Sequence, residues 1–279
     1  EIYTVRNTLS LLDALPILTH GYVWLEALRR GLQSDADAER MEPAELVHDM
    51  AEVSSQPRRK IIVAVHDLHR HGAQFLSLNF VATLRNVFGY EVSTIAGGDG
   101  SLAERFSTYG RLYVLPRGRV DEDIIRETVR GLEDEGYTRA IVNSSASAWL
   151  VPYFAEAGIE CIGLVHELPE LIRTMHLEPA LRALDRHARQ VVFASTFVEQ
   201  RTAKDVLGHD WAHPVIAPQG LYKRDGIVSL DEKELAWQRL CAELGLPETS
   251  RIVVGVGYGD RRKGVDRFCL WGVAAAKSD

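Results

Sequence analysis

The feature that most constrains the fold of this chain is a regular alternation of short β-branched runs with helical patterns from Arg58 onward. Such alternation is typical of parallel strands joined by right-handed helical crossovers. The run Ile61–Val65 is apolar at every position, as expected where helices cover both faces of a sheet. The sequence therefore predicts an α/β fold with a doubly wound parallel sheet over residues 58–221.

The individual elements follow from apolar periodicity. Strands are expected at Lys60–Val65, Glu91–Ala96, Leu112–Leu115, Ala140–Asn143, Glu160–Val165, Gln190–Ala194 and Pro214–Ile216. Helices are expected at Phe75–Phe88, Asp121–Gly136, Trp149–Gly158, Leu177–Ala188, Thr196–Val206 and Asp231–Leu244. A further strand, Arg251–Gly257, is expected to begin a second βα unit, whereas Cys269–Asp279 is a poor match to the helix that should follow it.

The ends of the chain look different from its middle. Residues 1–17 contain a string, Arg6–Ile17, that is similar to translated sequencing-adapter read-through, so we expect them to be an artefact. Residues 18–57 predict a helical lead-in, residues 222–250 a linker with one helix, and residues 251–279 the start of a further domain. Because that domain would have only begun, the chain is expected to be a fragment.

Composition excludes several classes of protein. The net charge of -7 argues against a nucleic-acid partner and against strong attachment to an anionic membrane. Three widely spaced cysteines do not form a disulfide framework or a zinc motif, so a reducing, cytoplasmic location is expected. No apolar run approaches the ~20 residues of a transmembrane helix.

Polar residues that follow the predicted strands are the candidates for chemistry, because doubly wound folds bind ligands at the carboxyl ends of strands. His66, His69 and His71 precede Gly72, and their spacing favours a solvated loop over a metal site. His166 and Glu167 end another strand, where an imidazole and a carboxylate could transfer protons, grip hydroxyl groups or serve structure alone.

A glycine-rich turn, Gly255–Lys263, contains Arg261, Arg262 and Lys263. Flexible backbone beside cations suits a diphosphate. The glycine spacing matches neither the dinucleotide nor the P-loop fingerprint, so spacing leaves a phosphate site and a solvated basic turn equally open.

Taken in order, five segments resemble the retaining glycosyltransferases of the GT-B fold (glycosyl transferases group 1, family four). They are His71–Gln74, Leu164–Pro169, Val192–Ser195, Ala217–Gly220 and, most specifically, Gly257–Asp266. The resemblance implies two Rossmann-like domains, with the acceptor handled by residues 58–221 and a nucleotide-sugar donor by the domain that begins near residue 251.

The resemblance also implies roles for particular residues. His166 would be the catalytic-site residue that faces the transferred sugar, Gly72, Ala73 and Glu167 would line the acceptor side of the cleft, and Arg262 and Lys263 would bind the donor diphosphate. The nucleotide sugar would be a substrate, a saccharide or lipid-linked molecule the acceptor, and neither a cofactor nor a metal would be needed.

Two departures from the family pattern accompany these expectations. Tyr258 stands where many members have arginine, and the later carboxylate pair would lie beyond Asp279, so this chain alone is expected to be inactive. A non-catalytic Rossmann-like binding or regulatory domain is the alternative hypothesis. A dehydrogenase fits less well, because the first strand is followed by a single glycine in Val65–Gln74.

Overall fold

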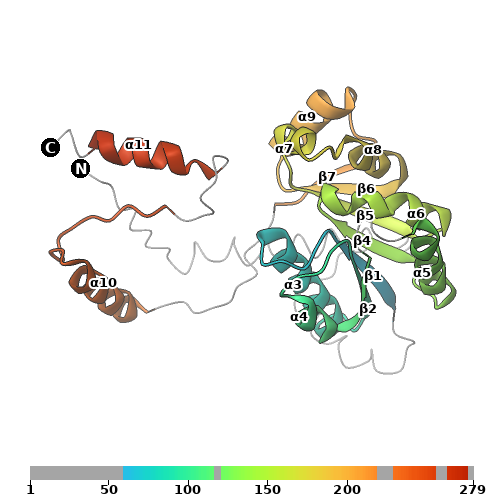
Figure 1. Cartoon of the computed structure of the whole chain (residues 1–279), viewed down its shortest axis with the longest axis horizontal. Helices are drawn as coiled ribbons and strands as arrows, with labels where there is room; N and C mark the ends of the chain where they lie inside the picture. Colours follow the sequence, from blue (N-terminus) through green and yellow to red (C-terminus); the bar gives the residue numbers. More distant parts are fainter. Residues whose placement is uncertain (1–58, 116–120, 219–228, 256–262, 276–279) are drawn as a thin grey trace, which may run out of the picture. The chain divides into compact units, whose positions relative to one another are not determined.

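The computed structural model describes residues 59–115, 121–218, 229–255 and 263–275 (Figure 1). The chain divides between residues 222 and 223 into two compact units. Residues 59–218 belong to the larger unit and residues 229–275 to the smaller one, and each is described below by itself.

The larger unit is built on a seven-stranded sheet with the strand order β3-β2-β1-β4-β5-β6-β7, in which every pairing is parallel. The strands are β1 (Lys60–Val65), β2 (Glu91–Ala96), β3 (Gly110–Val114), β4 (Arg139–Asn143), β5 (Glu160–Val165), β6 (Ala188–Phe193) and β7 (Pro214–Ile216). The order reverses between β1 and β4, because β2 and β3 lie on one side of β1 while all later strands lie on the other.

Helices cover both faces of this sheet (Figure 1). They are α3 (Gly72–Asn86), α4 (Ala103–Ser107), α5 (Glu122–Asp134), the 3-10 helix η3 (Ser145–Leu150), α6 (Val151–Glu156), α7 (Pro169–Thr174), α8 (Glu178–His187), α9 (Thr196–Thr202) and the π-helical turn η4 (Ala203–Leu207). Figure 1 shows α3 and α4 on one side of the sheet and α5 and α6 on the other.

Two apolar cores lie on the opposite faces of the sheet, since successive side chains of a strand point to opposite faces. Ile62 and Ala64 face a core completed by α5, α6 and α8, whereas Ile61 and Val63 face one completed by α3 and α4. All four side chains are fully buried. The prediction of a doubly wound parallel sheet is therefore confirmed.

The differences from prediction are local. β3, β4 and β6 begin one or two residues before the expected strands, and α3 begins at Gly72 instead of Phe75. The short helices α4 and α7 were not predicted, because five or six residues hold too little apolar periodicity to detect. Residues 145–150 form a 3-10 helix before α6, where one continuous helix was expected from Trp149.

The smaller unit contains α10 (Leu230–Leu244) and α11 (Val265–Ala275). The expected strand Arg251–Gly257 is wrong over residues 251–255, which form no ladder, and residues 256–257 lie outside the described residues. A strand requires a neighbour to pair with, and the described residues after 228 include no strand. The expectation of poor helix after Cys269 is also wrong as far as Ala275, since the apolar run through α11 has no helix breaker except Gly272.

Candidate functional site

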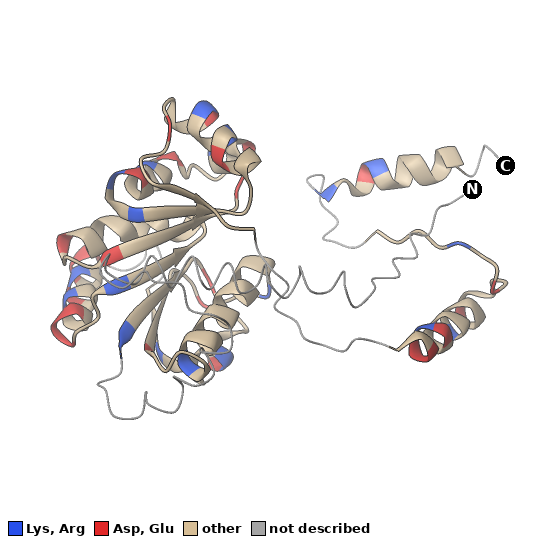
Figure 2. Ribbon diagram, turned by 180° about the vertical axis from the view of Figure 1, so that it is seen from behind, with Lys and Arg blue, Asp and Glu red and all other residues tan. Residues whose placement is uncertain are grey.

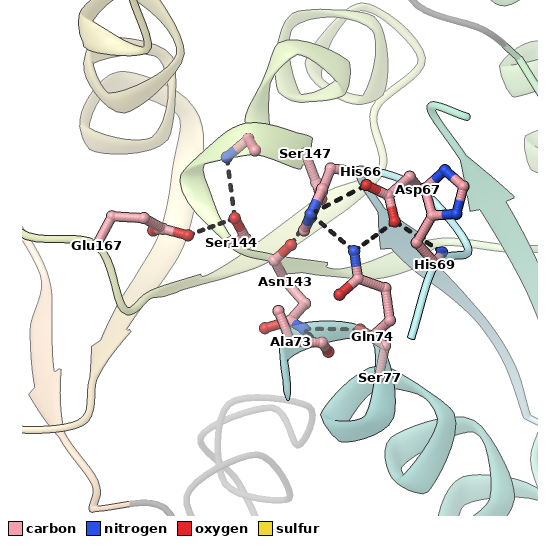
Figure 3. A network of polar contacts seen from close by, with 11 residues as sticks. His66, Asp67, His69, Ala73, Gln74, Ser77, Asn143, Ser144, Ser147 and Glu167 are labelled. Carbon is pink, nitrogen blue, oxygen red and sulfur yellow. Dashed lines mark hydrogen bonds and ion pairs between the residues drawn. The ribbon is translucent and has the colours of Figure 1, made fainter. Parts of the chain in front are cut away.

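The carboxyl ends of β1, β4 and β5 form the candidate site. We call this the carboxyl edge of the sheet, and the opposite edge, where the strands begin, the amino edge. The strand order reverses between β1 and β4, so their carboxyl ends flank the switch point at which doubly wound folds bind ligands. Side chains from the loops after β1, β4 and β5 meet there (Figure 3).

The loop after β1 is organised by Gln74, a fully buried residue in the first turn of α3. Its Nε2 donates to Asp67 Oδ1 at 2.5 Å and to His66 Nε2 at 2.8 Å. Asp67 Oδ1 also accepts from the His69 amide at 2.9 Å. The imidazole of His66 therefore presents an unprotonated Nε2 to Gln74. Burial lowers the pKa of His66 more than Asp67 and Glu167 raise it, so the ring is held neutral.

The loop after β2 holds this first loop by close backbone contact. A methyl group at Gly100 would lie 2.2 Å from the Leu68 carbonyl carbon, so only glycine fits. The Leu102 amide donates to the Leu68 carbonyl at 2.9 Å. The position of His66 and Asp67 is thus set by packing between loops as well as by the end of β1.

Asn143, the last residue of β4, contacts helix α3 through its side chain (Figure 3). Its Nδ2 donates to the Ala73 carbonyl at 2.8 Å and to Ser77 Oγ at 2.7 Å. Its Oδ1 lies 2.7 Å from His166 Nε2. One buried amide therefore connects the first turn of α3 to the histidine that follows β5.

Glu167 is held by donors from the turn after β4 and by the backbone amide of the residue before it. Oε1 accepts from Ser144 Oγ at 2.5 Å, and Oε2 accepts from Ser145 Oγ at 2.8 Å and from the amides of Ser145 and His166 at 3.2 Å each. Burial raises the pKa of Glu167, but the hydrogen bonds from Ser144 and Ser145, together with the charge that His166 carries when it is protonated, lower the pKa by more, so the group is a carboxylate near neutral pH. Its oxygens are occupied by the protein.

Ser144 adopts a backbone conformation that side chains rarely take, with φ 77° and ψ 143°. Such a conformation costs about 1–3 kcal/mol and persists only where surrounding contacts enforce it. Glu167 and the Ala146 amide, which donates to Ser144 Oγ at 3.1 Å, supply those contacts. Backbone strain is therefore stored beside the switch point.

His166 lies between these groups and is partly buried. Burial lowers the pKa of its imidazole, and Glu167 raises it less, so the ring is neutral near pH 7. The described carboxyl edge thus combines two neutral imidazoles with the carboxylates of Asp67 and Glu167. Such a set of groups hydrogen-bonds hydroxyl groups well.

The other predicted site residues lie in different places. Gly72 and Ala73 are the first residues of α3, adjacent to the network, and the N-cap residue His71 makes no side-chain cap to the helix amides. Arg262 lies outside the described residues. Lys263 is exposed in the smaller unit, just before α11. Gly72, Ala73, His166 and Glu167 are brought together at one edge, and their roles stay predictions.

Gln74, Asn143, Ser144 and Ser145 belong to the network but were not identified from sequence. Position at the end of a predicted strand could have flagged Asn143 and the two serines, since Ala140–Asn143 was an expected strand. Nothing in the sequence signals the positive φ of Ser144, because glycine and asparagine are the usual markers. In the part of the chain that the structure describes, no three His, Cys, Asp or Glu side chains are placed to hold a metal ion.

Comparison with known proteins supports the fold. No protein-family model matches the sequence, and no curated protein matches it. HepE of Anabaena, solved in complex with UDP, matches with a TM-score of 0.51 at 15% identity over 67% of this chain and 50% of that one. A glycosyltransferase of Rickettsia africae matches with a TM-score of 0.48 at 15% identity over 71% of this chain and 55% of that one.

The chain spans about half the length of these solved structures. The likeness to HepE supports a shared fold, and the sheet of residues 59–218 is that of a Rossmann-like α/β protein. Among the helices of the described residues, none has the length and apolar character needed to cross a membrane.

Proposed function

We propose that this chain is the acceptor-side part of a cytoplasmic glycosyltransferase that moves a sugar from a nucleoside diphosphate to a saccharide or lipid-linked acceptor, with retention of configuration. The observation that carries the proposal is the network of His66, Asp67, Asn143, His166 and Glu167 at the switch point of a doubly wound sheet. The fold shared with HepE agrees with it.

The chemistry of the carboxyl edge suits a sugar. A sugar hydroxyl both donates and accepts hydrogen bonds, and neutral imidazoles and carboxylates offer acceptors at fixed positions. His166 is the residue that would contact the transferred sugar. Glu167 would act on the acceptor side indirectly, because its oxygens are occupied by Ser144, Ser145 and the His166 amide.

Gly72 supports close approach of a ligand to the start of α3. A methyl group at this position would meet no atom within 4 Å, so the fold itself does not require glycine there. The first amides of a helix have no partner within the helix and attract negative or hydroxyl-rich groups. A phosphate oxygen or a hydroxyl could therefore approach the backbone of Gly72 and Ala73.

The donor diphosphate would be held by Arg262 and Lys263. Fixed cations stabilise the charge that develops on a departing nucleoside diphosphate, so the reaction would need neither a metal ion nor another cofactor. The described residues after 228 form helices without a sheet, and we propose on this ground that the chain alone does not transfer sugar.

Titration of the chain with UDP, GDP and ADP tests the proposal. One of them should bind saturably, and Lys263→Ala should weaken it about tenfold or more, since a hydrogen bond to a charged group contributes about 1.5–3 kcal/mol. Lys233→Ala is the control, because Lys233 is also exposed in the same unit. The proposal fails if no nucleotide binds. Equal weakening by the control would instead indicate a nonspecific charge effect and favour the non-catalytic domain.

A further inference from the structure

We propose that Asn143 is a positioning residue that fixes the imidazole of His166 with its proton on Nε2 and its acceptor lone pair on Nδ1. The inference adds detail to the proposed function, and it rests on that function only for the contact between the His166 ring and a sugar hydroxyl. The assignment of a proton to Nε2 stands on geometry alone, and the lone pair on Nδ1 also rests on the burial that favours the neutral ring.

The orientation of the Asn143 amide is fixed by its other partners. Nδ2 lies 2.8 Å from the Ala73 carbonyl oxygen, which can only accept a hydrogen bond. The amide nitrogen must therefore face Ala73, and Oδ1 must face His166 Nε2 at 2.7 Å. Because an amide oxygen also can only accept, the hydrogen between the two atoms belongs to Nε2.

The Asn143 side chain is buried and held by several neighbours. Asn143 is 1% exposed, pairs with Leu164 across β4 and β5, and accepts from Ser147 Oγ at its own backbone oxygen over 2.6 Å. Ser77 accepts from the same Nδ2 at 2.7 Å. Both N–H groups of the Asn143 amide are therefore used, and the buried amide cannot rotate without losing them. Its oxygen consequently selects one orientation of the His166 ring.

The charge around the ring agrees with a neutral imidazole. The Glu167 carboxylate raises the pKa of His166, and burial outweighs it and lowers the pKa overall. The Glu167 carboxylate is directed toward Ser144 (Figure 3). A neutral ring protonated on Nε2 is an acceptor at Nδ1, which matches a hydroxyl group and not a phosphate oxygen.

The test begins with the unaltered chain in the absence of any ligand. Long-range 1H–15N NMR near pH 7.5 separates protonated from unprotonated ring nitrogens, and His166→Gln identifies the His166 signals among the ten histidines. We expect a protonated Nε2 and an unprotonated Nδ1. A proton on Nδ1, or on both nitrogens, overturns the proposal.

Two variants then separate positioning from packing. Asn143→Asp replaces the amide oxygen by a carboxylate, and should raise the midpoint of the His166 titration by about 1–3 pH units. Ser77→Ala removes the other side-chain partner of Asn143 and should leave the ring proton and the midpoint unchanged. An unchanged midpoint in Asn143→Asp, or an altered tautomer in Ser77→Ala, contradicts the proposal.

The outcome does not depend on sugar transfer. If nucleotides fail to bind while the ring carries its proton on Nε2, the proposed function fails and the positioning role stands. If a nucleotide binds while the proton lies on Nδ1, the positioning role fails and the proposed function stands.

Discussion

The two edges of the same sheet are built from different interactions. At the amino edge, several strands carry a basic residue at their first or second position, and Figure 2 shows Lys and Arg in blue. These residues pair with carboxylates that are exposed or half-buried: Lys60 with Glu91, Arg139 and Arg189 with Glu160, and Arg111 with Glu135. At the carboxyl edge, none of the described strands β1–β7 ends in a basic residue, and the side chains of Gln74, Asn143 and Ser145 are buried.

The two edges are expected to differ in how much stability is lost when one side chain is removed. An exposed ion pair contributes about 0–1 kcal/mol, and the loss of one is tolerated. A buried hydrogen-bond network is costly to break, because each donor left without a partner costs about 1–3 kcal/mol. The carboxyl edge therefore depends on individual residues in a way that the amino edge does not, and the following substitutions test that contrast.

The largest effect is expected from Glu167→Ala, compared with Glu160→Ala at the other end of β5. Glu167→Ala removes the acceptor of Ser144, Ser145 and the His166 amide, and should cost about 3 kcal/mol in the free energy of unfolding. Glu160→Ala breaks pairs at 3.3 and 3.6 Å and should cost about 1 kcal/mol or less. Urea unfolding measures both, and equal losses would remove the contrast between the edges.

A smaller effect is expected from pH. The folded-state pKa values of His66, His166 and Glu167 all lie below their unfolded values, so the unfolded chain binds more protons. The contribution of these three groups to the free energy of unfolding is fully present above about pH 6.5. It decreases below that pH as the histidines become protonated, and it decreases further below about pH 4.3 as Glu167 becomes protonated. Urea midpoints across this range measure the loss. The double variant His66→Gln/His166→Gln should flatten the upper part of the curve, and a gain in stability on acidification would contradict these directions.

Two substitutions at Ser144 test whether its backbone is strained. Ser144→Ala loses the hydroxyl contacts and keeps the strained backbone, whereas Ser144→Gly loses the same contacts and relieves the strain. The glycine variant should therefore be more stable than the alanine variant by about 1 kcal/mol, after allowance for the greater freedom of glycine in the unfolded chain. Thermal or urea unfolding of the pair measures this difference, and a more stable alanine variant would show that Ser144 is not strained.

The sequence was a good guide to the sheet and a poor one to the network. β1, β2, β5 and β7 begin and end where predicted, because continuous apolar runs such as Ile61–Val65 carry a strong local signal. The contacts of Asn143 join residues 23 and 70 positions apart, and only the folded sheet brings them together. The sequence places His166 and Glu167 at the end of a strand. The hydrogen bonds between Glu167 and the turn after β4 depend on the positive φ of Ser144, which serine as a residue type does not predict.

The smallest effect on stability is expected from a substitution at Gly72. This substitution tests the carboxyl edge by its effect on ligand binding, with little effect on folding. Gly72 and Gly131 both lie in helices, and a methyl group at either would meet no atom within 4 Å. Gly72→Ala and Gly131→Ala should each change the free energy of unfolding by no more than the ~1 kcal/mol that separates glycine from alanine in a helix, in the stabilising direction.

The same two variants should differ in binding. The added methyl group at position 72 would occupy space beside the first amides of α3, so Gly72→Ala should weaken the nucleotide or acceptor that approaches them, whereas Gly131→Ala on α5 should not. Titration with the nucleoside diphosphate that binds best, and with a saccharide acceptor, measures this. If both variants bind as the unaltered chain does, no ligand approaches the backbone at Gly72, and the carboxyl edge must contact its ligand through side chains such as His166 alone.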